Sequence, residues 1–179
     1  MNKRQWGLVV MAGLIAAALG MSLSSFKYRT TSATDQAVEL FFKQELKSPE
    51  GVIYDTNQWR NKLLVLNYWA SWCPPCVEEM PVLEKSHHAY KDKNVVFVGI
   101  GVDSPSNIRE FLLKTKISYP ITVSPLDGVN WAKSMGNPSG GLPFTVLIDE
   151  KGVIKKTKLG KITEDELKSW LDSAILSSK

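Results

Sequence analysis

The chain has 179 residues, of which 44% are hydrophobic and 22% are charged, a composition typical of a globular domain. Its formal net charge is only +4 at pH 7, which is too small for the basic surface that nucleic-acid binding requires. No nucleic-acid partner is therefore expected, and the lysine-rich run at residues 155–161 is interpreted as the solvated edge of a sheet.

The N-terminus carries an apolar segment that points to a membrane. Lys3 and Arg4 are followed by residues 5–26, which carry no charge. The apolar part, residues 6–23, lies between a secretory signal and a transmembrane helix in length, so a cleaved signal peptide and an uncleaved signal anchor both stay open. We prefer the anchor in the inner, cytoplasmic membrane, because the basic residues favour a cytoplasmic N-terminus. In both cases the rest of the chain is expected to be periplasmic or otherwise extracytoplasmic.

The chain divides into three parts on this interpretation. Residues 1–26 are the signal anchor or signal peptide, and residues 27–35 form a polar tether. Residues 36–179 have the length of a single domain.

The first half of the domain predicts two short strands and then a buried one. Residues 37–46 alternate partly between apolar and polar side chains, which predicts a strand. A turn at residues 48–51 and a short strand at residues 52–54 follow. Residues 63–70 form an apolar run interrupted only by Asn67, as expected for a central strand that is covered on both faces.

A helix, a second buried strand and another helix come next. Residues 75–90 fit an amphipathic helix with Val77, Met80, Leu83 and Ala89 on its apolar face, and an internal proline is expected to kink it. Residues 95–102 again read as a buried strand. A helix that begins with a serine cap and a proline is predicted over residues 104–116.

The remaining elements complete an α/β architecture. We predict a short strand at residues 119–123, a short helix at 128–136, a hairpin over 144–160 and a final helix over 163–176 that opens with a capping box. Strands that alternate with helices and end in a hairpin predict a mixed sheet flanked by helices.

The chain has two cysteines, Cys73 and Cys76, which could bind a metal, form a structural disulfide or catalyse redox chemistry. Structural zinc needs four ligands. His87 and His88, the only histidines, are neighbours on a predicted helix and point about 100° apart, so we expect them to be exposed and no metal to bind. A structural role is also weak, because so short a loop adds little chain entropy.

Redox catalysis has a positive physical argument. Pro74 starts the predicted helix, which puts the Cys73 sulfur at its N-cap, where free backbone N–H groups and the helix dipole favour a thiolate. Cys76 lies one turn further on and should be shielded, so it would resolve the mixed disulfide that Cys73 forms with a substrate. Disulfide-bearing substrates occur outside the cytoplasm. We predict a redox-active disulfide between Cys73 and Cys76 that works without a cofactor.

Two segments resemble a known family. The stretch "VLNYWASWCPPCVEEMP" (65–81), followed by "GLPFTVLIDEKGVI" (141–154), is similar to the thioredoxin fold and specifically to TlpA/ResA-like membrane-anchored thiol-disulfide oxidoreductases. The resemblance covers roughly residues 36–177 and implies that residues 104–123 are the helix and strand that this family inserts into the basic fold.

The resemblance also implies a function and partners. Such proteins reduce disulfides in exported proteins, often in cytochrome c maturation, and they take electrons from a membrane thiol reductase. We therefore expect a protein-disulfide reductase with a disulfide-containing exported protein as its substrate.

Several site residues follow from the resemblance. Pro143 occupies the position of a cis-proline facing the cysteines, which would aim the backbone of Leu142 at the substrate, although a trans proline at the start of a strand is the alternative. Glu79 matches an acid that exchanges protons near Cys76, and a surface glutamate is the alternative.

Three further residues complete the predicted site. Asn67 stands where thioredoxin itself has a buried acid, so it is expected to give structural support and, if buried, to be hydrogen-bonded. Trp72 and Pro74 flank Cys73 and are expected to contact the substrate.

Two other functions occur on the same fold. A copper-binding and delivery module is the main alternative, but such modules use a distant histidine, and no histidine follows His88. A thiol peroxidase is less compatible, because the threonine and arginine that accompany a peroxidatic cysteine are absent from the motif.

Overall fold

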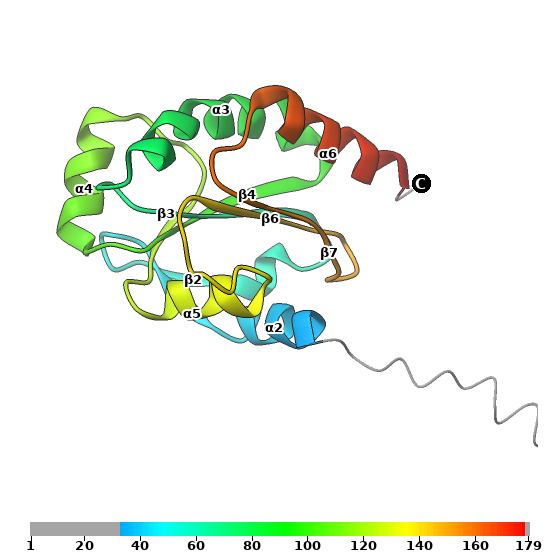
Figure 1. Cartoon of the computed structure of the whole chain (residues 1–179), viewed down its shortest axis with the longest axis horizontal. Coiled ribbons are helices and arrows are strands. Elements are labelled where there is room, and N and C mark those ends of the chain that lie inside the picture. The colour runs from blue at the N-terminus through cyan, green and yellow to red at the C-terminus, as the bar shows by residue number, and fades with distance from the viewer. Residues whose placement is uncertain (1–32, 178–179) are drawn as a thin grey trace, which may run out of the picture. The chain divides into compact units, whose positions relative to one another are not determined.

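A seven-stranded mixed sheet with helices on both faces organises residues 33–177, the part of the chain that the computed structural model describes (Figure 1). The predicted signal segment and the residues of the predicted tether before Ala33 lie outside the described residues. The elements are α2 (Ala33–Phe41), β1 (Glu45–Lys47), β2 (Ile53–Asp55), β3 (Leu63–Trp69), α3 (Pro74–Tyr90), β4 (Val95–Gly101), α4 (Pro105–Lys114), β5 (Ile121–Val123), α5 (Asp127–Ser134), β6 (Phe144–Ile148), β7 (Ile154–Leu159) and α6 (Glu164–Ser177).

The strand order is β2-β1-β5-β4-β3-β6-β7. β3, β4 and β5 are parallel to one another, whereas β6 and β7 form an antiparallel hairpin beside β3. The predicted mixed sheet and the closing hairpin are confirmed. β7 is an edge strand whose lysines are mostly exposed, as predicted for the lysine-rich run.

The prediction of a strand over residues 37–46 is wrong. Residues 33–41 form helix α2, and only Glu45–Lys47 pairs as a strand. The reason is visible in the spacing of the buried residues, because Ala37, Val38 and Phe41 fall on one side of a helix and pack under the sheet. Two adjacent phenylalanines in this run obscure the helical period in the sequence.

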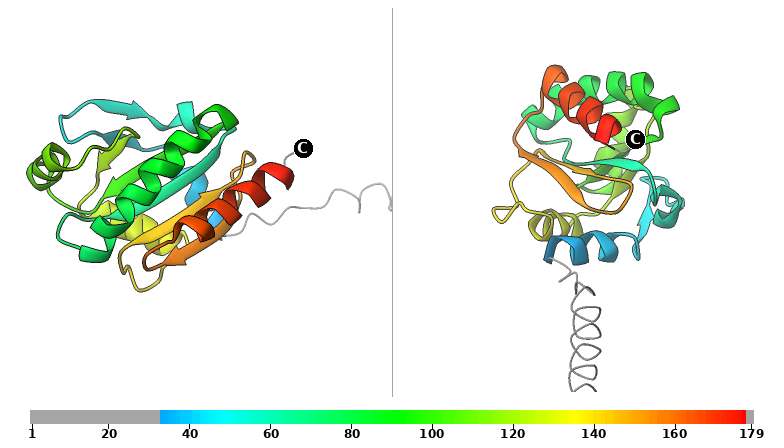
Figure 2. Two further views of the ribbon diagram at one scale, coloured as in Figure 1. Left: turned by 90° about the horizontal axis from the view of Figure 1, so that it is seen from above. Right: turned by 90° about the vertical axis from the view of Figure 1, so that its right-hand side faces the viewer.

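Two hydrophobic cores hold the helices to the sheet. α3 and α6 lie side by side on one face, and α2 and α5 cover the other, as the two views of Figure 2 show. Every residue of β3 is buried, because its side chains alternate between the two cores. Val65 and Trp69 enter the first core, and Leu64 and Leu66 enter the second.

The helix that carries Cys76 starts at Pro74, the residue predicted to begin it. α3 begins at Pro74 and continues past Pro81 to Tyr90. Met80 and Leu83 are buried as predicted, but Ala89 is exposed, so its place on the apolar face was wrong.

The segment at residues 104–123 forms helix α4 and strand β5, as the resemblance implied. The Ser104 hydroxyl caps α4 by accepting a hydrogen bond from the backbone N–H of Asn107. β5 pairs with β4 on one side and, through Lys47 and Val123, with β1 on the other. The insertion therefore joins the first hairpin to the central sheet. Within residues 33–177, no helix has the length and apolarity needed to cross a membrane.

Candidate active site

The two cysteines lie where the central strand meets helix α3. Cys73 is the N-cap residue of α3, and Pro74 follows it at the first helical position, as predicted. Cys73 and Cys76 form a disulfide with a Cα–Cα distance of 5.3 Å. The Cys73 N–H donates to the carbonyl of Ala70, which holds the loop after β3 in a turn. The sulfur of Cys73 therefore sits at the positive end of the helix dipole.

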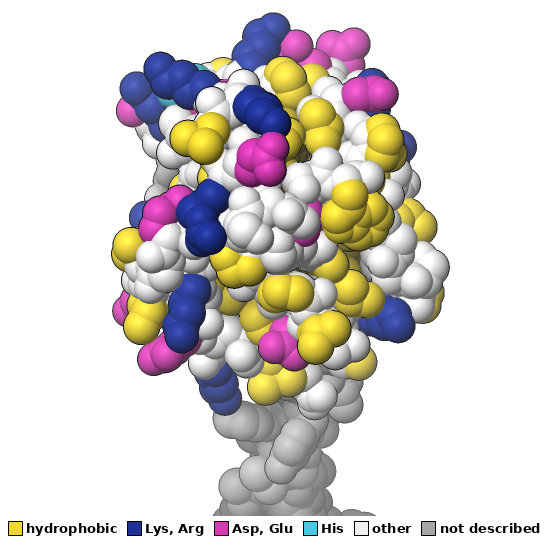
Figure 3. Space-filling view, turned by 90° about the vertical axis from the view of Figure 1, so that its left-hand side faces the viewer, with side chains coloured by type: hydrophobic (Ala, Val, Ile, Leu, Met, Phe, Trp, Pro, Cys, Tyr) yellow, Lys and Arg dark blue, Asp and Glu magenta, His cyan; other side chains and the backbone are white. Residues whose placement is uncertain are grey.

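Access to the disulfide differs between its two halves. Cys76 has no exposed surface, whereas Cys73 is 5% exposed and the neighbouring Trp72 is 65% exposed. Pro74 is exposed as well. Figure 3 looks onto the side of the molecule where β3 and β4 end, and hydrophobic side chains gather near the middle of that face. A partner that reaches the disulfide meets Cys73 first.

Glu79 lies one turn after Cys76 and is fully buried, so the alternative of a surface glutamate is wrong. Its Oε1 accepts a hydrogen bond of 2.7 Å from Nδ2 of Asn67, and its Oε2 accepts one of 2.8 Å from the backbone N–H of Ile162. Burial raises the pKa of Glu79 to about 7, against the opposing effect of these hydrogen bonds and of Lys161. The carboxyl group can therefore both accept and release a proton near neutral pH.

Asn67 supports this carboxylate from the central strand. It is 2% exposed, and its Nδ2 also donates to Oγ1 of Thr145 at 3.1 Å. Its Oδ1 has no hydrogen-bond partner among the described residues. The expectation that a buried Asn67 amide is hydrogen-bonded is therefore confirmed for the nitrogen but not for the oxygen.

The peptide bond between Leu142 and Pro143 is cis, so the trans alternative is wrong. Pro143 directly precedes Phe144, which pairs with Tyr68 near the end of β3. This register places the cis peptide at the same end of the sheet as the cysteines. Leu142 is half-buried and packs against the core that contains Cys73 and Cys76.

Asp103 is a buried residue of the site that the sequence reasoning missed. Its Oδ2 accepts hydrogen bonds from the backbone N–H and the hydroxyl of Ser71, at 3.1 and 2.6 Å. Its Oδ1 accepts from the N–H of Ser104 and from Nδ2 of Asn107. These bonds outweigh the effect of burial and lower the pKa of Asp103. A signal was available, because an aspartate followed by Ser-Pro after a buried strand suggests a side chain that binds local backbone.

The histidines lie away from this site. His88 is exposed as predicted, but His87 is half-buried and its ring packs edge-on against Phe97 and Tyr119. The expectation of exposure was therefore wrong for His87. Among residues 33–177, no three His, Cys, Asp or Glu side chains form a group that could hold a metal ion.

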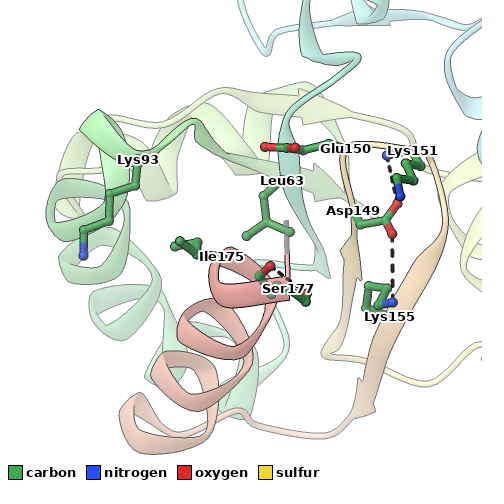
Figure 4. A pocket seen from close by; sticks show the side chains of 9 residues that line it. Leu63, Lys93, Asp149, Glu150, Lys151, Lys155, Ile175 and Ser177 are labelled. Atoms are coloured by element: carbon green, nitrogen blue, oxygen red, sulfur yellow. Dashed lines mark hydrogen bonds and ion pairs between the residues drawn. The ribbon is translucent and has the colours of Figure 1, made fainter. Parts of the chain in front are cut away.

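A polar hollow of about 400 Å³ lies at the opposite end of β3 (Figure 4). Leu63, the first residue of β3, lines it together with Asp149, Lys155 and Ile175. Asp149 and Lys155 are paired at 4.0 Å, and the Asp149 side chain also accepts from the N–H of Lys151. Asp149 is therefore paired with neighbouring residues in the lining of the hollow.

The family model called Redoxin matches residues 21–174. The chain belongs to the Redoxin family.

Relatives of this Redoxin-family protein agree on the type of chemistry. It is 31% identical over 177 residues to the thiol-disulfide oxidoreductase ResA of Geobacillus thermodenitrificans, which covers 96% of this chain and 98% of the relative. It is also 30% identical to the sporulation thiol-disulfide oxidoreductase A of Bacillus subtilis, over 60% of this chain and 66% of the relative. The protein is therefore an enzyme, a thiol-disulfide oxidoreductase related to ResA.

Solved structures confirm the fold. A thioredoxin-related protein from Neisseria meningitidis serogroup B superposes with a TM-score of 0.66 at 35% identity, covering 75% of this chain and all of that one. A thiol:disulfide interchange protein from Chlorobium tepidum gives the same TM-score at 20% identity over 74% of this chain and 92% of that one, which supports the fold alone. The predicted thioredoxin-like fold is confirmed for the described residues.

Proposed function

We propose that Cys73 is the attacking cysteine, that Cys76 is the resolving cysteine and that Glu79 handles the proton between the two steps. In the reduced enzyme the Cys73 thiolate attacks a substrate disulfide, which forms a mixed disulfide and releases one substrate thiolate. Cys76 then passes its proton to Glu79 and attacks the sulfur of Cys73. The second substrate thiolate leaves, the substrate is reduced by two electrons, and the Cys73–Cys76 disulfide remains.

The main observation in support of this assignment is the different exposure of the two cysteines. The side chain at the helix N-cap, Cys73, keeps 5% of its surface exposed, whereas Cys76 has none. A buried carboxyl group with a pKa of about 7 follows on the same helix. This arrangement supplies a stabilised thiolate, a shielded second thiol and a proton acceptor, in the order in which the exchange needs them.

We further propose that Trp72, Pro74, Leu142 and Pro143 contact the substrate. Trp72 and Pro74 offer exposed apolar surface on either side of Cys73. In this proposal the backbone of Leu142, the half-buried residue before Pro143, pairs with an extended substrate segment. Asn67 does not touch the substrate in this proposal and instead supports Glu79.

The proposed physiological role is reduction of disulfides in exported proteins, for example in cytochrome c maturation. Residues 1–26 would act as a signal anchor that inserts residues 6–23 into the cytoplasmic membrane, and residues 27–32 would tether the domain, whose first helix, α2, begins at Ala33. Electrons would come from a membrane thiol reductase. The charge-free N-terminal segment and the resemblance to ResA-like proteins support this proposal.

A trapping experiment tests the roles of the cysteines. The full chain with Cys76→Ser, reduced and mixed with a peptide disulfide, should accumulate a mixed disulfide at Cys73, because the resolving thiol is missing. The matched Cys73→Ser variant should accumulate little. Equal trapping through Cys76 would refute the assignment, and circular dichroism of both variants serves as the folding control.

A second experiment tests location and pathway. A membrane-impermeant thiol reagent added to intact cells should label the reduced enzyme, because the proposal places Cys73 outside the cytoplasm. Deletion of the gene should lower the amount of haem-stained c-type cytochromes, and an added small thiol should restore it. Protection from the reagent in intact cells would contradict the proposed location.

A further inference from the structure

The chain between β7 and α6 contacts two separate parts of the active site. We call residues 160–162 the β7–α6 connector. All three residues bond to the site or to its immediate neighbour, Glu78. Figure 1 shows this part of the chain rising from the end of β7 to the start of α6, beside α3.

The first bond ties the connector to the cis-proline turn. The N–H of Gly160 donates to the carbonyl of Pro143 at 2.8 Å. Gly160 has a φ of +92°, a backbone conformation that L side chains rarely adopt, and no atom lies within 4 Å of the position that a Cβ would take. The glycine is therefore needed for its backbone conformation and not for close packing.

The second bond ties the connector to the buried carboxylate. The N–H of Ile162 donates to Oε2 of Glu79 at 2.8 Å, and the Ile162 side chain is fully buried. Between them, Nζ of Lys161 donates to Oε2 of Glu78 at 2.8 Å on the surface of α3. A displacement of the connector would therefore change the hydrogen bonding of Glu79 directly.

Few charged groups face Glu79 from the surrounding elements. Lys161 of the connector favours its ionised form, and Glu78 beside it on α3 is paired with that lysine. Tyr119, before β5, is buried and neutral, and its pKa is raised in part by Glu79. The groups that β3 and β6 contribute, Asn67 and Thr145, are uncharged. The Ile162 N–H is thus one of only two donors on Glu79 itself among the described residues.

We propose that the β7–α6 connector couples substrate docking at the cis-proline turn to the proton affinity of Glu79. The inference rests on the proposed function. A substrate segment that pairs with Leu142 displaces the turn, and the Gly160–Pro143 bond carries the displacement to Ile162. Withdrawal of the Ile162 N–H, together with exclusion of water by the substrate, makes the carboxylate a stronger proton acceptor.

The timing suits the second step of exchange. Cys76 must lose its proton only after the mixed disulfide with Cys73 has formed. When Glu79 gains proton affinity on docking, the proton of the Cys76 thiol moves to Oε2 or Oε1 and the Cys76 thiolate attacks Cys73. The proton returns to solvent after the substrate leaves. No further reactant is required.

Two disulfides of different size test the coupling on the reduced full chain. Bis(2-hydroxyethyl) disulfide reaches Cys73 but has no backbone to pair with Leu142, whereas the disulfide of an extended eight-residue peptide has one. The rate of enzyme oxidation is followed against pH with each. The part of the pH–rate profile that is lost in the Glu79→Gln variant is assigned to the titration of Glu79. Its midpoint is the pH at which Glu79 is half-ionised.

Gly160→Ala is the informative variant and Gly51→Ala is its matched control. Gly51 has a φ of +88° and the same open surroundings, but it lies in the turn between β1 and β2. Both changes place a Cβ on a residue with positive φ, so the unfolding temperature should fall to a similar extent in the two variants. Only Gly160→Ala disturbs the bond to Pro143.

We expect the Glu79 midpoint to be higher with the peptide than with the small disulfide by about half a pH unit. Gly160→Ala should abolish this difference and Gly51→Ala should keep it. Equal midpoints in the unsubstituted enzyme, or an unchanged difference in Gly160→Ala, would overturn the coupling. Failure of both disulfides to oxidise the enzyme would instead overturn the proposed function.

An NMR measurement covers the case in which Gly160→Ala does not fold. In the labelled full chain the amide signals of Ile162 and Gly160 should titrate with one common midpoint near that of Glu79, and Glu79→Gln should abolish both responses. A Gly160 amide that stays constant while Ile162 titrates would overturn the coupling.

Discussion

At the scale of single residues, Glu79 shows how burial produces reactivity. A carboxylate removed from water loses hydration, and two hydrogen bonds replace only part of it, so its pKa rises to about 7. The same shift costs stability, because the ionised form is disfavoured only in the folded chain. Reactivity and instability at this residue have one cause.

This linkage predicts how stability depends on pH. Because the pKa of Glu79 is raised from 4.5 to about 7, the folded chain binds more protons than the unfolded chain between these values. The free energy of unfolding should therefore fall as the pH rises through that window, by up to about 3 kcal/mol from this group. Urea titrations of the oxidised enzyme at pH 4.5 and pH 8 measure the fall.

Two variants isolate the contribution of Glu79. Glu79→Gln should remove most of the fall between pH 4.5 and pH 8, whereas Glu78→Gln, which changes an exposed neighbour, should leave it in place. An identical pH dependence in both variants would show that the Glu79 carboxylate is ionised at little cost.

Single residues were predicted unevenly from the sequence. The spacing of the two cysteines and of the proline between them predicted that Cys73 caps the helix, that Pro74 begins it and that Cys76 lies one turn further on. The hydrogen-bond partners of Glu79 were not predicted, because Asn67 and Ile162 lie in a strand and a loop that are distant from Glu79 in the chain. Hydrogen bonds between distant segments leave no local pattern to read.

At the scale of elements, Asp103 fastens the loop before Cys73 to the start of helix α4. Its carboxylate accepts four hydrogen bonds, two from Ser71 and two from the first residues around α4. The inserted helix therefore helps to fix the position of the reactive cysteine. This contact gives the insertion a structural role in the site.

Asp103→Asn should loosen that loop. The amide cannot accept from all four donors, so the free energy of unfolding should fall by about 1–3 kcal/mol at pH 7. Because the pKa of Asp103 is lowered in the folded chain, its stabilisation is present at neutral pH and lost as the pH falls below about 4. The free energies of unfolding of the unsubstituted enzyme and the variant should therefore become similar at acidic pH.

The measurement is urea unfolding of both proteins at pH 7 and pH 3, with Asp127→Asn, at the start of α5, as a control. The reduced Asp103→Asn variant should also react more slowly with a peptide disulfide. Unchanged stability at pH 7 would show that the loop is held by other contacts.

Strands and helices whose apolar residues follow one clear spacing were predicted correctly, and the others were not. β3 is apolar except for Asn67, β4 is an apolar run, and the β6–β7 hairpin has its turn at Asp149–Gly152, so each was found with small errors at the ends. α2 was misassigned because its buried residues suit both a short strand and one helical face. Packing of that face beneath the sheet decides the outcome.

At the scale of the whole molecule, the sheet separates the reactive end from the polar hollow. The cysteines and the cis-proline turn lie where β3 ends, and the hollow lies where β3 begins. Two cores, one on each face, hold the scaffold between these ends. The site is therefore built at one end of the sheet, by the last part of β3, the start of α3 and the turn at Pro143.

The direction of electron flow is a property of the whole fold. An enzyme that reduces its substrates must favour its own disulfide, so the oxidised chain should be more stable than the reduced one. Closing so short a loop contributes about 2 kcal/mol through chain entropy alone. Urea unfolding of the oxidised and reduced enzyme at pH 7 measures the difference, and a more stable reduced form would indicate an oxidant instead.

The most direct test of the account is the alkylation of the reduced full chain by iodoacetamide as a function of pH, with each cysteine followed by mass spectrometry. Cys73 should react first, with a midpoint well below the value of about 8.5 for a free thiol, while Cys76 stays protected. A Cys73 midpoint at or above 8.5, or faster labelling of Cys76, would contradict the claim that the helix N-terminus holds a ready thiolate.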